Sequence, residues 1–197
     1  MATFSKRQTQ IIESAIELIA RGGIQELTIK NIATEIGISE PAIYRHFESK
    51  QEILVAIQNL FAGEKRLFFS RILGDETVAL DKIKRIMEHH FLSFSAKPAL
   101  AAVMFSEEIF QNDQRLAGMV LEIMNQSRSA ITQIIEEGQL SSTIRADIPA
   151  KDLVTIIMGS LRLTVKTWQL NKCTYDLIEA GQAFLQSIRK ILEPDLQ

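Results

Sequence analysis

The sequence predicts an all-α protein of about nine helices. Apolar residues recur at three- and four-residue spacing along nearly the whole chain of 197 residues. Strict alternation of apolar and polar residues, which is typical of half-buried strands, is scarce. The 9 glycines and 4 prolines fall at breaks between the periodic segments. We therefore expect amphipathic helices joined by turns.

The N-terminal part of the chain predicts two helices before residue 37. The first spans roughly residues 5–21 and is ended by a Gly-Gly pair. Its apolar stripe consists of Ile11, Ile12, Ala15, Leu18 and Ile19. Thr28 is placed to cap a second helix over 29–36, and Gly37 supplies the tight turn that follows.

A very short third helix and a long fourth helix follow. Ser39 is placed to cap the third helix, and Pro41 lies in its first turn, where a missing N–H does no harm. Residues 49–52 read Ser-Lys-Gln-Glu, which is a capping box. The fourth helix is therefore expected to begin near Lys50 and to continue towards Leu73.

The rest of the chain predicts five more helices and one long loop. Asp113 is placed to cap the third of these five helices. The longest loop is expected over 139–150. The helices are expected over about 78–95, 98–110, 114–138, 151–170 and 175–192.

Composition and charge exclude several classes of protein. The chain is 46% hydrophobic and 23% charged, which is ordinary for a globular protein and unlike a disordered one. The formal net charge of −2 points neither to nucleic acid nor to a membrane surface. The single cysteine, Cys173, excludes an intrachain disulfide and a cysteine-rich zinc site, and we expect it to be a small buried or half-buried residue.

The N-terminal segment lacks the apolar core and the small-residue cleavage site of a signal peptide. No uninterrupted apolar run reaches the roughly 20 residues that a membrane-spanning helix needs. We therefore predict a cytoplasmic protein that does not enter a membrane.

The second and third helices have the length and the turn of a helix-turn-helix. Ile43 and Phe47 are four residues apart on the third helix and can pack inward with Ile32 and Ile36. Polar and aromatic side chains are then left on the outer face. A helix this short is hard to explain as core material, but it suits entry into a major groove of about 12 Å, N-terminal end first.

The outward residues divide by the chemistry they offer to DNA. Hydroxyl, imidazole and ammonium groups can donate to phosphate oxygens, and these are Thr28, Tyr44, His46 and Lys50. Lys30 and Arg45 can read guanine edges, Glu40 can accept from cytosine, and Pro41 and Ala42 can touch thymine methyls. With Ser39 at the turn, the predicted DNA-binding set is Thr28, Lys30, Ser39, Glu40, Pro41, Ala42, Tyr44, Arg45, His46 and Lys50.

This stretch resembles the DNA-binding segment of TetR-type bacterial transcriptional repressors, over about residues 5–65. The matching residues are Thr28, Ile32-Ala33, Gly37-Ile38-Ser39, Ile43-Tyr44-Arg45-His46-Phe47 and Lys50. The resemblance implies a three-helix DNA-binding head, a larger helical domain for effector binding and dimerisation, and control by a small ligand. It also implies that Tyr44 and Lys50 contact phosphates, while the positions of Lys30, Glu40, Pro41, Ala42 and Arg45 contribute to base reading.

The predicted domains are a head over 1–49, with its motif at 28–47, and an effector-binding and dimerisation domain over 50–197. Residues 1–50 carry six basic and six acidic side chains and thus no net charge. Binding must then depend on few phosphate contacts per head and on two heads per site. A helical hairpin that contacts no DNA is the structural alternative.

The larger domain is rich in phenylalanine and methionine, including Phe110. These side chains can form the core, or they can line a cavity between helices. The lining that we predict is Phe91, Phe94, Met104, Phe105 and Met124. A small, mostly apolar effector would fit, such as a drug-like aromatic, a fatty acid or an acyl thioester.

His89 and His90, near Glu107 and Glu108, suggest a metal site at first sight. Adjacent histidines project about 100° apart on a helix, however, and no pair has the four-residue spacing of a helical site. We therefore predict no metal and no cofactor. No nucleophile and base occur in a catalytic pattern, so we do not expect an enzyme. A small helical enzyme with an apolar pocket and a helical adaptor protein remain the alternatives.

The last two helices carry wide apolar stripes. Gly159 and Ser160 are small enough to let another helix approach. Two such helices from each of two copies would form a four-helix bundle, although packing within one chain is the alternative. The predicted dimer interface is Leu153, Ile157, Leu161, Val165, Phe184 and Ile188.

A homodimer would place two recognition helices on a palindromic operator, on major-groove faces about 34–36 Å apart. Taken together, the sequence predicts a ligand-responsive regulator that binds double-stranded DNA. We expect a repressor that leaves its operator when the effector binds.

Overall fold

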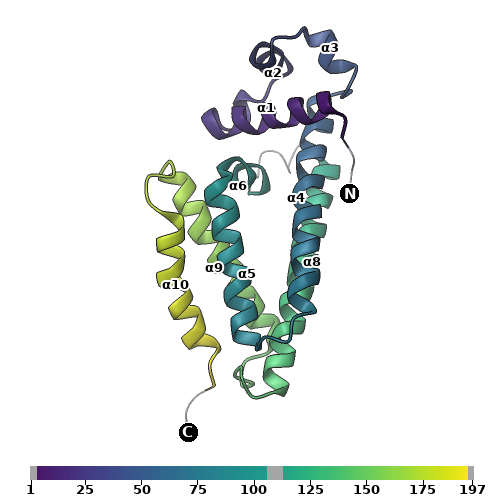
Figure 1. Ribbon diagram of the computed structural model, residues 1–197. Coiled ribbons are helices and arrows are strands. Elements are labelled where there is room, and N and C mark those ends of the chain that lie inside the picture. Colours follow the sequence, from purple (N-terminus) through teal and green to yellow (C-terminus); the bar gives the residue numbers. More distant parts are fainter. Residues whose placement is uncertain (1–3, 106–112, 195–197) are drawn as a thin grey trace. The chain divides into compact units, whose positions relative to one another are not determined.

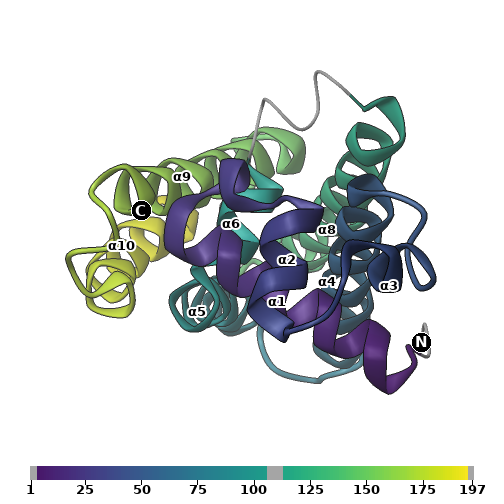
Figure 2. The ribbon, with the colours of Figure 1, turned by 90° about the horizontal axis from the view of Figure 1, so that it is seen from above.

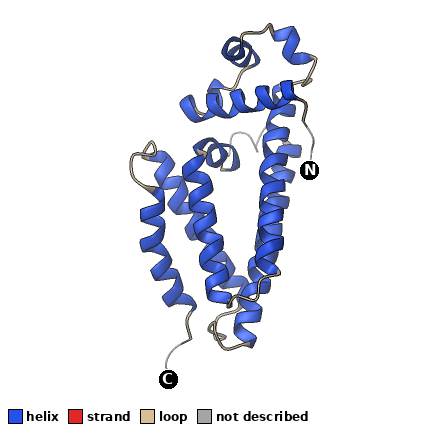
Figure 3. Ribbon diagram, viewed as in Figure 1, coloured by secondary structure: helices blue, strands red, loops and turns tan. Residues whose placement is uncertain are grey.

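The computed structural model describes residues 4–105 and 113–194. Within these residues there are nine α-helices, one short 3-10 helix and no strand (Figures 1 and 3). The all-α prediction is therefore confirmed. In the same residues, no helix is both long and apolar enough to cross a membrane.

The chain divides into two compact units. The first consists of described residues 4–66, 97–105 and 113–122, and the second of 67–96 and 123–194. Two long helices, α4 and α8, contribute to both units. The predicted boundary at residue 49 separates a DNA-binding head from an effector-binding domain. This functional boundary stays a prediction.

The first unit holds the predicted head. Its helix α1 contacts the 3-10 helix η1, α2 and α6, while α2 contacts α3. Figure 2 shows α1, α2 and α3 from above. Its elements are α1 (Lys6–Gly22), η1 (Ile24–Glu26), α2 (Ile29–Ile36), α3 (Glu40–Tyr44), α6 (Pro98–Met104), most of α4 (Lys50–Leu73) and the start of α8 (Gln114–Leu140).

Helix α1 begins with a capping box that was not predicted. The Ser5 hydroxyl accepts from the Gln8 N–H at 3.2 Å, and the Gln8 side-chain oxygen accepts from the Ser5 N–H at 3.0 Å. The predicted apolar stripe is confirmed, because all five of its residues are buried. The helix is thus fixed at its start by two hydrogen bonds and along its length by the core.

Helix α6 is shorter than predicted. It ends at Met104, and the Phe105 N–H closes it by donating to the Ala101 carbonyl at 3.0 Å. The predicted end near Phe110 is therefore wrong for the described part. Residues 106–112, with Phe110, lie outside the described residues. Asp113 caps α8 as predicted, accepting from the Arg115 and Leu116 N–H groups.

The second unit is a bundle of long helices. It consists of α5 (Ala79–Ala96), α9 (Ala150–Leu170), α10 (Leu177–Leu192) and the ends of α4 and α8. Helix α10 packs against α5 and α9 (Figure 1). The close approach of α10 to α5 depends on Gly181, since a Cβ there would lie 2.4 Å from Cδ2 of Phe91.

The single tryptophan lies in the last turn of α9, and the single cysteine lies in the connection between α9 and α10. Trp168 is buried, and its Nε1–H donates to the Tyr175 carbonyl at 2.9 Å. Cys173 is exposed, in the left-handed region at φ 56°. The expectation that Cys173 is buried or half-buried is therefore wrong, because a turn and not a helix face positions it.

Candidate nucleic-acid interface

Helix α2 has the predicted signals at both ends. The Thr28 hydroxyl accepts from the Asn31 N–H at 3.0 Å and so caps the N-terminus. Gly37 follows the last turn at φ 68°, a left-handed conformation that glycine adopts without strain. The Gly37 N–H donates back to the Thr34 carbonyl at 3.3 Å. The turn into α3 is therefore set by the backbone itself.

Helix α3 is a short helix that begins through backbone contacts. The Ser39 carbonyl accepts from the Ala42 N–H at 2.9 Å. The Ser39 side chain makes no capping bond to the described chain and is exposed. Its predicted role as a side-chain cap is therefore wrong, and its hydroxyl is free to face outward. Pro41 lies in the first turn as predicted.

Inward and outward residues separate as predicted in and after α3, but the prediction that Phe47 lies on this helix is wrong, because α3 ends at Tyr44. Ile32, Ile43 and Phe47 are buried in the first unit. Ile36 is only half-buried, because it lies at the end of α2 next to the turn. Tyr44 is 51% exposed, although tyrosine is large and apolar over most of its surface. The buried Ile43 and Phe47 thus leave the Tyr44 side chain on the outer side of this segment.

All ten residues of the predicted DNA-binding set reach the surface. Thr28, Lys30 and Lys50 lie at the starts of α2 and α4, and the other seven form the stretch from Ser39 to His46 with its inward Ile43 left out. Ala42 and Lys50 are half-buried and the other eight are exposed. Because α2 contacts α3, the predicted DNA-binding residues of these two helices lie close together.

The segment just after α3 is linked to α1 by a hydrogen bond from Gln8. Its side-chain nitrogen donates to the His46 carbonyl at 3.3 Å, while its oxygen completes the α1 capping box. Gln8 is not among the residues predicted for the site. Ser5 followed three residues later by Gln8 has the spacing of a capping box and was the available signal.

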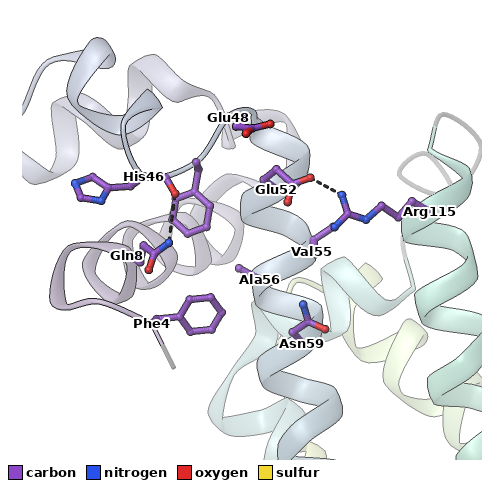
Figure 4. Close-up of a pocket in the computed structure, with 10 residues that line it drawn as sticks. Phe4, Gln8, His46, Glu48, Glu52, Val55, Ala56, Asn59 and Arg115 are labelled. Carbon is purple, nitrogen blue, oxygen red and sulfur yellow. Dashed lines mark hydrogen bonds and ion pairs between the residues drawn. The ribbon is translucent and has the colours of Figure 1, made fainter. Parts of the chain in front are cut away.

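A hollow of about 470 Å³ opens beside this tie (Figure 4). Phe4 and Gln8 line one side, and Val55, Ala56 and Asn59 of α4 line another. The start of α4 is held by a hydrogen bond within its own first turn. The Ser49 hydroxyl accepts from the Glu52 N–H at 3.3 Å.

The predicted capping box at α4 is therefore half present. The Glu52 carboxylate forms an ion pair with Arg115 of α8 instead of turning back to Ser49 (Figure 4). A charged partner is a stronger attraction for a carboxylate than a backbone N–H.

One base and one acid of the head neutralise each other. Arg21 and Glu35 form an ion pair at 2.7 Å, and the hydrogen bond to Glu35 raises the pKa of Arg21. Both side chains are partly exposed, so the pair contributes little to stability. The exposed Lys30 and Arg45 remain on the candidate recognition surface.

Comparison with known proteins agrees with this geometry. The family described as bacterial regulatory proteins, tetR family, matches residues 11–57. The C-terminal region of YsiA-like proteins, a TetR-type C-terminal domain, matches residues 68–190. The chain belongs to the TetR family. It is therefore a DNA-binding transcriptional regulator, and α2 and α3 are its TetR-family helix-turn-helix.

Relatives in the TetR family match along nearly their whole length. The fatty acid metabolism regulator protein of Bacillus subtilis is 27% identical over 180 residues, which are 90% of this chain and 91% of that protein. The crystal structure of FadR from Bacillus subtilis in complex with stearoyl-CoA has a TM-score of 0.74 at 25% identity, covering 93% of this chain and 98% of that one. The fatty acid degradation regulator FadR from Bacillus halodurans has a TM-score of 0.78 at 22% identity, covering 95% and 97%.

The five residues predicted to line an effector pocket divide between the two units. Phe91, Phe94 and Met124 belong to the second unit, and Met104 and Phe105 to the first. Phe91, Phe94 and Met104 are buried, while Phe105 and Met124 are half-buried. The Phe91 ring packs on Gly181, so this side chain contributes to the core of the second unit.

The six residues predicted at the dimer interface also separate by burial. Leu153, Ile157, Val165 and Ile188 are buried within their own protomer. These four side chains therefore contribute to the core of the second unit. Leu161 and Phe184 are half-buried.

A different face of α9 is apolar and exposed. It carries Ile156, Gly159, Leu163 and Leu170, of which Leu163 is 68% and Leu170 74% exposed. These four positions share one helix face by their spacing. A Cβ at Gly159 would meet nothing within 4 Å in the described chain. We call these four residues the α9 outer face.

The adjacent histidines have structural contacts. His89 stacks on Phe68, with ring centroids 3.8 Å apart. His90 is buried, and its Nδ1 lies 2.7 Å from the Ile86 carbonyl. Glu107 and Glu108, which suggested a metal site, lie outside the described residues. In the described part of this TetR-family chain, no group of three or more acidic, histidine or cysteine residues is arranged for a metal.

Proposed function

We propose that the protein is a cytoplasmic repressor that binds a palindromic operator as a homodimer. A small, mostly apolar effector releases it, and we propose a long-chain acyl thioester as the chemical class. The observation that carries the DNA-binding part is the exposure of Tyr44, at the end of α3, and of Arg45 and His46, just after it, beside the buried Ile43 and Phe47.

The ten surface residues named above are the proposed DNA contacts. Tyr44 and Lys50 would hold phosphates, and the Tyr44 ring is already exposed in the protein. Arg45 and Lys30 would approach guanine edges. Because the head as a whole carries no net charge, one head alone would bind weakly. Two heads on a two-fold dimer would supply the missing affinity.

The α9 outer face supports a dimer. Exposed leucines are costly in water, and a second copy of the same face would remove them from it. The two-fold axis would place Leu163 and Gly159 of each protomer near the partner helix. Leu161 and Phe184 stay in the proposed interface as half-buried rim residues. Leu153, Ile157, Val165 and Ile188 would support it from inside the bundle.

The relatives support the choice of effector. The Bacillus subtilis relative is a fatty acid metabolism regulator, and its FadR structure holds stearoyl-CoA. Met104 and Phe105, which belong to the first unit, remain the proposed apolar contacts for the acyl chain. Phe91, Phe94 and Met124 belong to the second unit and stay a prediction from the sequence. We propose that the protein acts by binding alone, without catalysis.

Release would follow from a population shift. The effector would bind more tightly to a conformation whose two heads do not fit the operator. A differential affinity of about 1–3 kcal/mol is enough for release by a factor of about 5–150. By reciprocity, operator DNA would weaken effector binding by the same factor.

The test is fluorescence anisotropy with labelled DNA from upstream of the protein's own gene. It is run at two salt concentrations with excess unlabelled competitor. We expect tight, salt-sensitive binding that resists the competitor and is lost on addition of stearoyl-CoA. Binding that the competitor removes would contradict a specific operator at that position. Binding that stearoyl-CoA leaves unchanged would contradict the proposed effector class.

A further inference from the structure

Gln58 on α4 is a polar residue in the core of the first unit. Its exposed fraction is 0%, and neither its side-chain oxygen nor its side-chain nitrogen has a hydrogen-bond partner among the residues that the structure describes. Nearly all buried polar groups in folded proteins are paired, and an unpaired one is costly. Gln58 therefore calls for an explanation beyond packing.

Packing alone favours an apolar residue at this position. The five residues before Gln58, from Ile53 to Ile57, are all apolar and all buried. Methionine has nearly the same length and shape as glutamine and no polar group to leave unpaired. Glutamine instead places one acceptor and two donors inside the unit. A molecule that is not part of the chain is the natural partner for them.

The neighbours of Gln58 on α4 indicate which chemical groups this ligand carries. Leu54, Phe61 and Lys65 are four residues before and three and seven residues after Gln58, so they share its helix face. The Lys65 ammonium lies 5.4 Å from the centre of the Phe61 ring. Desolvation lowers the pKa of Lys65 to about 8, so the group is poorly hydrated but still mostly charged at neutral pH.

The face thus presents an apolar group, a carboxamide, an aromatic ring and a cation in this order. At about 1.5 Å per residue, it extends about 16 Å from Leu54 to Lys65. A matching ligand is long and has an apolar part, a group that both donates and accepts hydrogen bonds, and an anionic part. A coenzyme A thioester has all three, since its carrier arm contains amides and ends in phosphates.

We propose that Gln58 is the residue that recognises the polar arm of the effector. Its carboxamide nitrogen donates to an amide or thioester carbonyl of the arm, and its oxygen accepts from an amide N–H. Lys65 pairs with an anionic group further along the same face. This inference rests on the proposed function and adds the residues that distinguish a thioester from a free fatty acid. An ionised carboxylate only accepts, so stearate leaves the Gln58 oxygen unpaired.

The deciding variant is Gln58→Met, which removes the amide and keeps the shape. The matched control is Asn59→Met, because Asn59 carries the same chemical group on the next residue but is exposed. Each protein is titrated with stearoyl-CoA and with stearate while bound to operator DNA, and anisotropy gives the concentration for half-release. The melting temperature of each free protein is measured as well.

We expect Gln58→Met to need on the order of 10 times more stearoyl-CoA for half-release, with operator affinity unchanged. Asn59→Met should stay within about a factor of two of the wild type. The free Gln58→Met protein should melt about 2–4 °C higher, because an unpaired amide no longer has to be buried. If Gln58→Met folds poorly, Gln58→Leu repeats the comparison.

Three results would overturn the assignment of Gln58. One is release of Gln58→Met at the wild-type concentration of stearoyl-CoA, and this leaves the proposed function intact. Another is a melting temperature several degrees lower in both Gln58→Met and Gln58→Leu, which would show that the Gln58 amide is already paired inside the chain. The third is equal potency of stearate and stearoyl-CoA on the wild type. If the wild type binds operator and neither stearoyl-CoA nor stearate releases it, the proposed effector class and the assignment of Gln58 are both overturned.

Discussion

The helix-turn-helix and the α9 outer face are both exposed, but they offer opposite chemistry. In α3 and just after it, the apolar residues Ile43 and Phe47 are buried and the polar residues face out. On α9 two faces are apolar, one turned into the bundle and one turned to water. A polar surface on a short helix is suited to a charged, hydrated partner such as DNA. An apolar surface on a long helix is suited to another helix.

This difference shows when a helix pattern can be assigned to a surface. In α3 and just after it, only Ile43 and Phe47 are both large and wholly apolar, so the inward side is determined and the polar residues must point out. On α9 the apolar residues extend around more than half of the helix. The pattern then leaves open which side packs within the chain, and burial separates Leu153 from Leu163 where spacing does not.

Tyr44→Ala should have the largest effect of the changes considered, because it should weaken DNA binding by the helix-turn-helix. Loss of a hydrogen bond to a charged group costs about 1.5–3 kcal/mol, and a dimer loses two. We expect operator affinity to fall on the order of 100-fold or more, measured by anisotropy. The melting temperature and the dimer should change little, since half of the side chain is already in water.

Tyr44→Phe is the matched control. It keeps the ring and removes only the hydroxyl. A loss as large as that of Tyr44→Ala would assign the effect to the phosphate hydrogen bond. Wild-type operator affinity in the alanine variant would instead show that α3 does not face DNA.

Leu163→Glu combined with Leu170→Glu should weaken dimerisation through the α9 outer face. Charges on the α9 outer face would oppose its burial against a second copy. We expect the dimer dissociation constant to rise on the order of 100-fold, measured by analytical ultracentrifugation. Operator affinity should fall with it, because single heads would then bind separately.

Leu153→Ala sharpens this prediction as a control within the same helix. Leu153 is buried, so its truncation should destabilise the fold by about 2–5 kcal/mol. It should leave the dimer dissociation constant nearly unchanged at a temperature where the protein is folded. The opposite result, a stable monomer from Leu153→Ala, would put the interface on the inner face.

Lys50→Ala should have a smaller effect on the DNA side. A phosphate contact carries no base information, so binding should weaken alike for all DNA sequences. The slope of log affinity against log salt should fall by about one unit for each head. A changed preference among operator variants, measured by competition, would instead assign Lys50 to base reading.

The Glu52–Arg115 pair should give the smallest effect. Both groups are partly exposed, so a double-mutant cycle of Glu52→Ala and Arg115→Ala should give a coupling of about 0.2–1 kcal/mol in the free energy of unfolding. The same cycle on operator affinity would show whether the pair matters for DNA binding. A coupling above that range in unfolding would mean that the pair is more strongly desolvated than its exposure indicates.

The sequence was most informative where local chemistry determines local structure. Thr28, Gly37 and Asp113 end or begin helices through contacts with residues near them in the chain, and these predictions are confirmed. It was less informative where distant contacts decide. The Glu52 carboxylate had an equally plausible local partner, and only the fold brings Arg115 near it.

The candidate site follows the same division. The exposure of Tyr44 and Arg45 follows from the inward packing of Ile43 and is visible in the helical spacing. The hydrogen bond by which Gln8 holds the segment after α3 joins residues 38 positions apart, and helical spacing does not predict it. The unpaired amide of Gln58 could not be predicted either, because nothing in an apolar helical pattern says whether a glutamine will find a partner.

The position of Trp168 gives the second unit a built-in optical label. It is the only tryptophan of the chain, and its indole is buried with its N–H held by the Tyr175 carbonyl. Its fluorescence emission should therefore be blue-shifted in the native protein and should shift to longer wavelength when the α9–α10 hairpin opens. Circular dichroism follows the helices of both units. If the two signals change at the same denaturant concentration, the units unfold as one cooperative system, and if fluorescence changes separately, they unfold in turn.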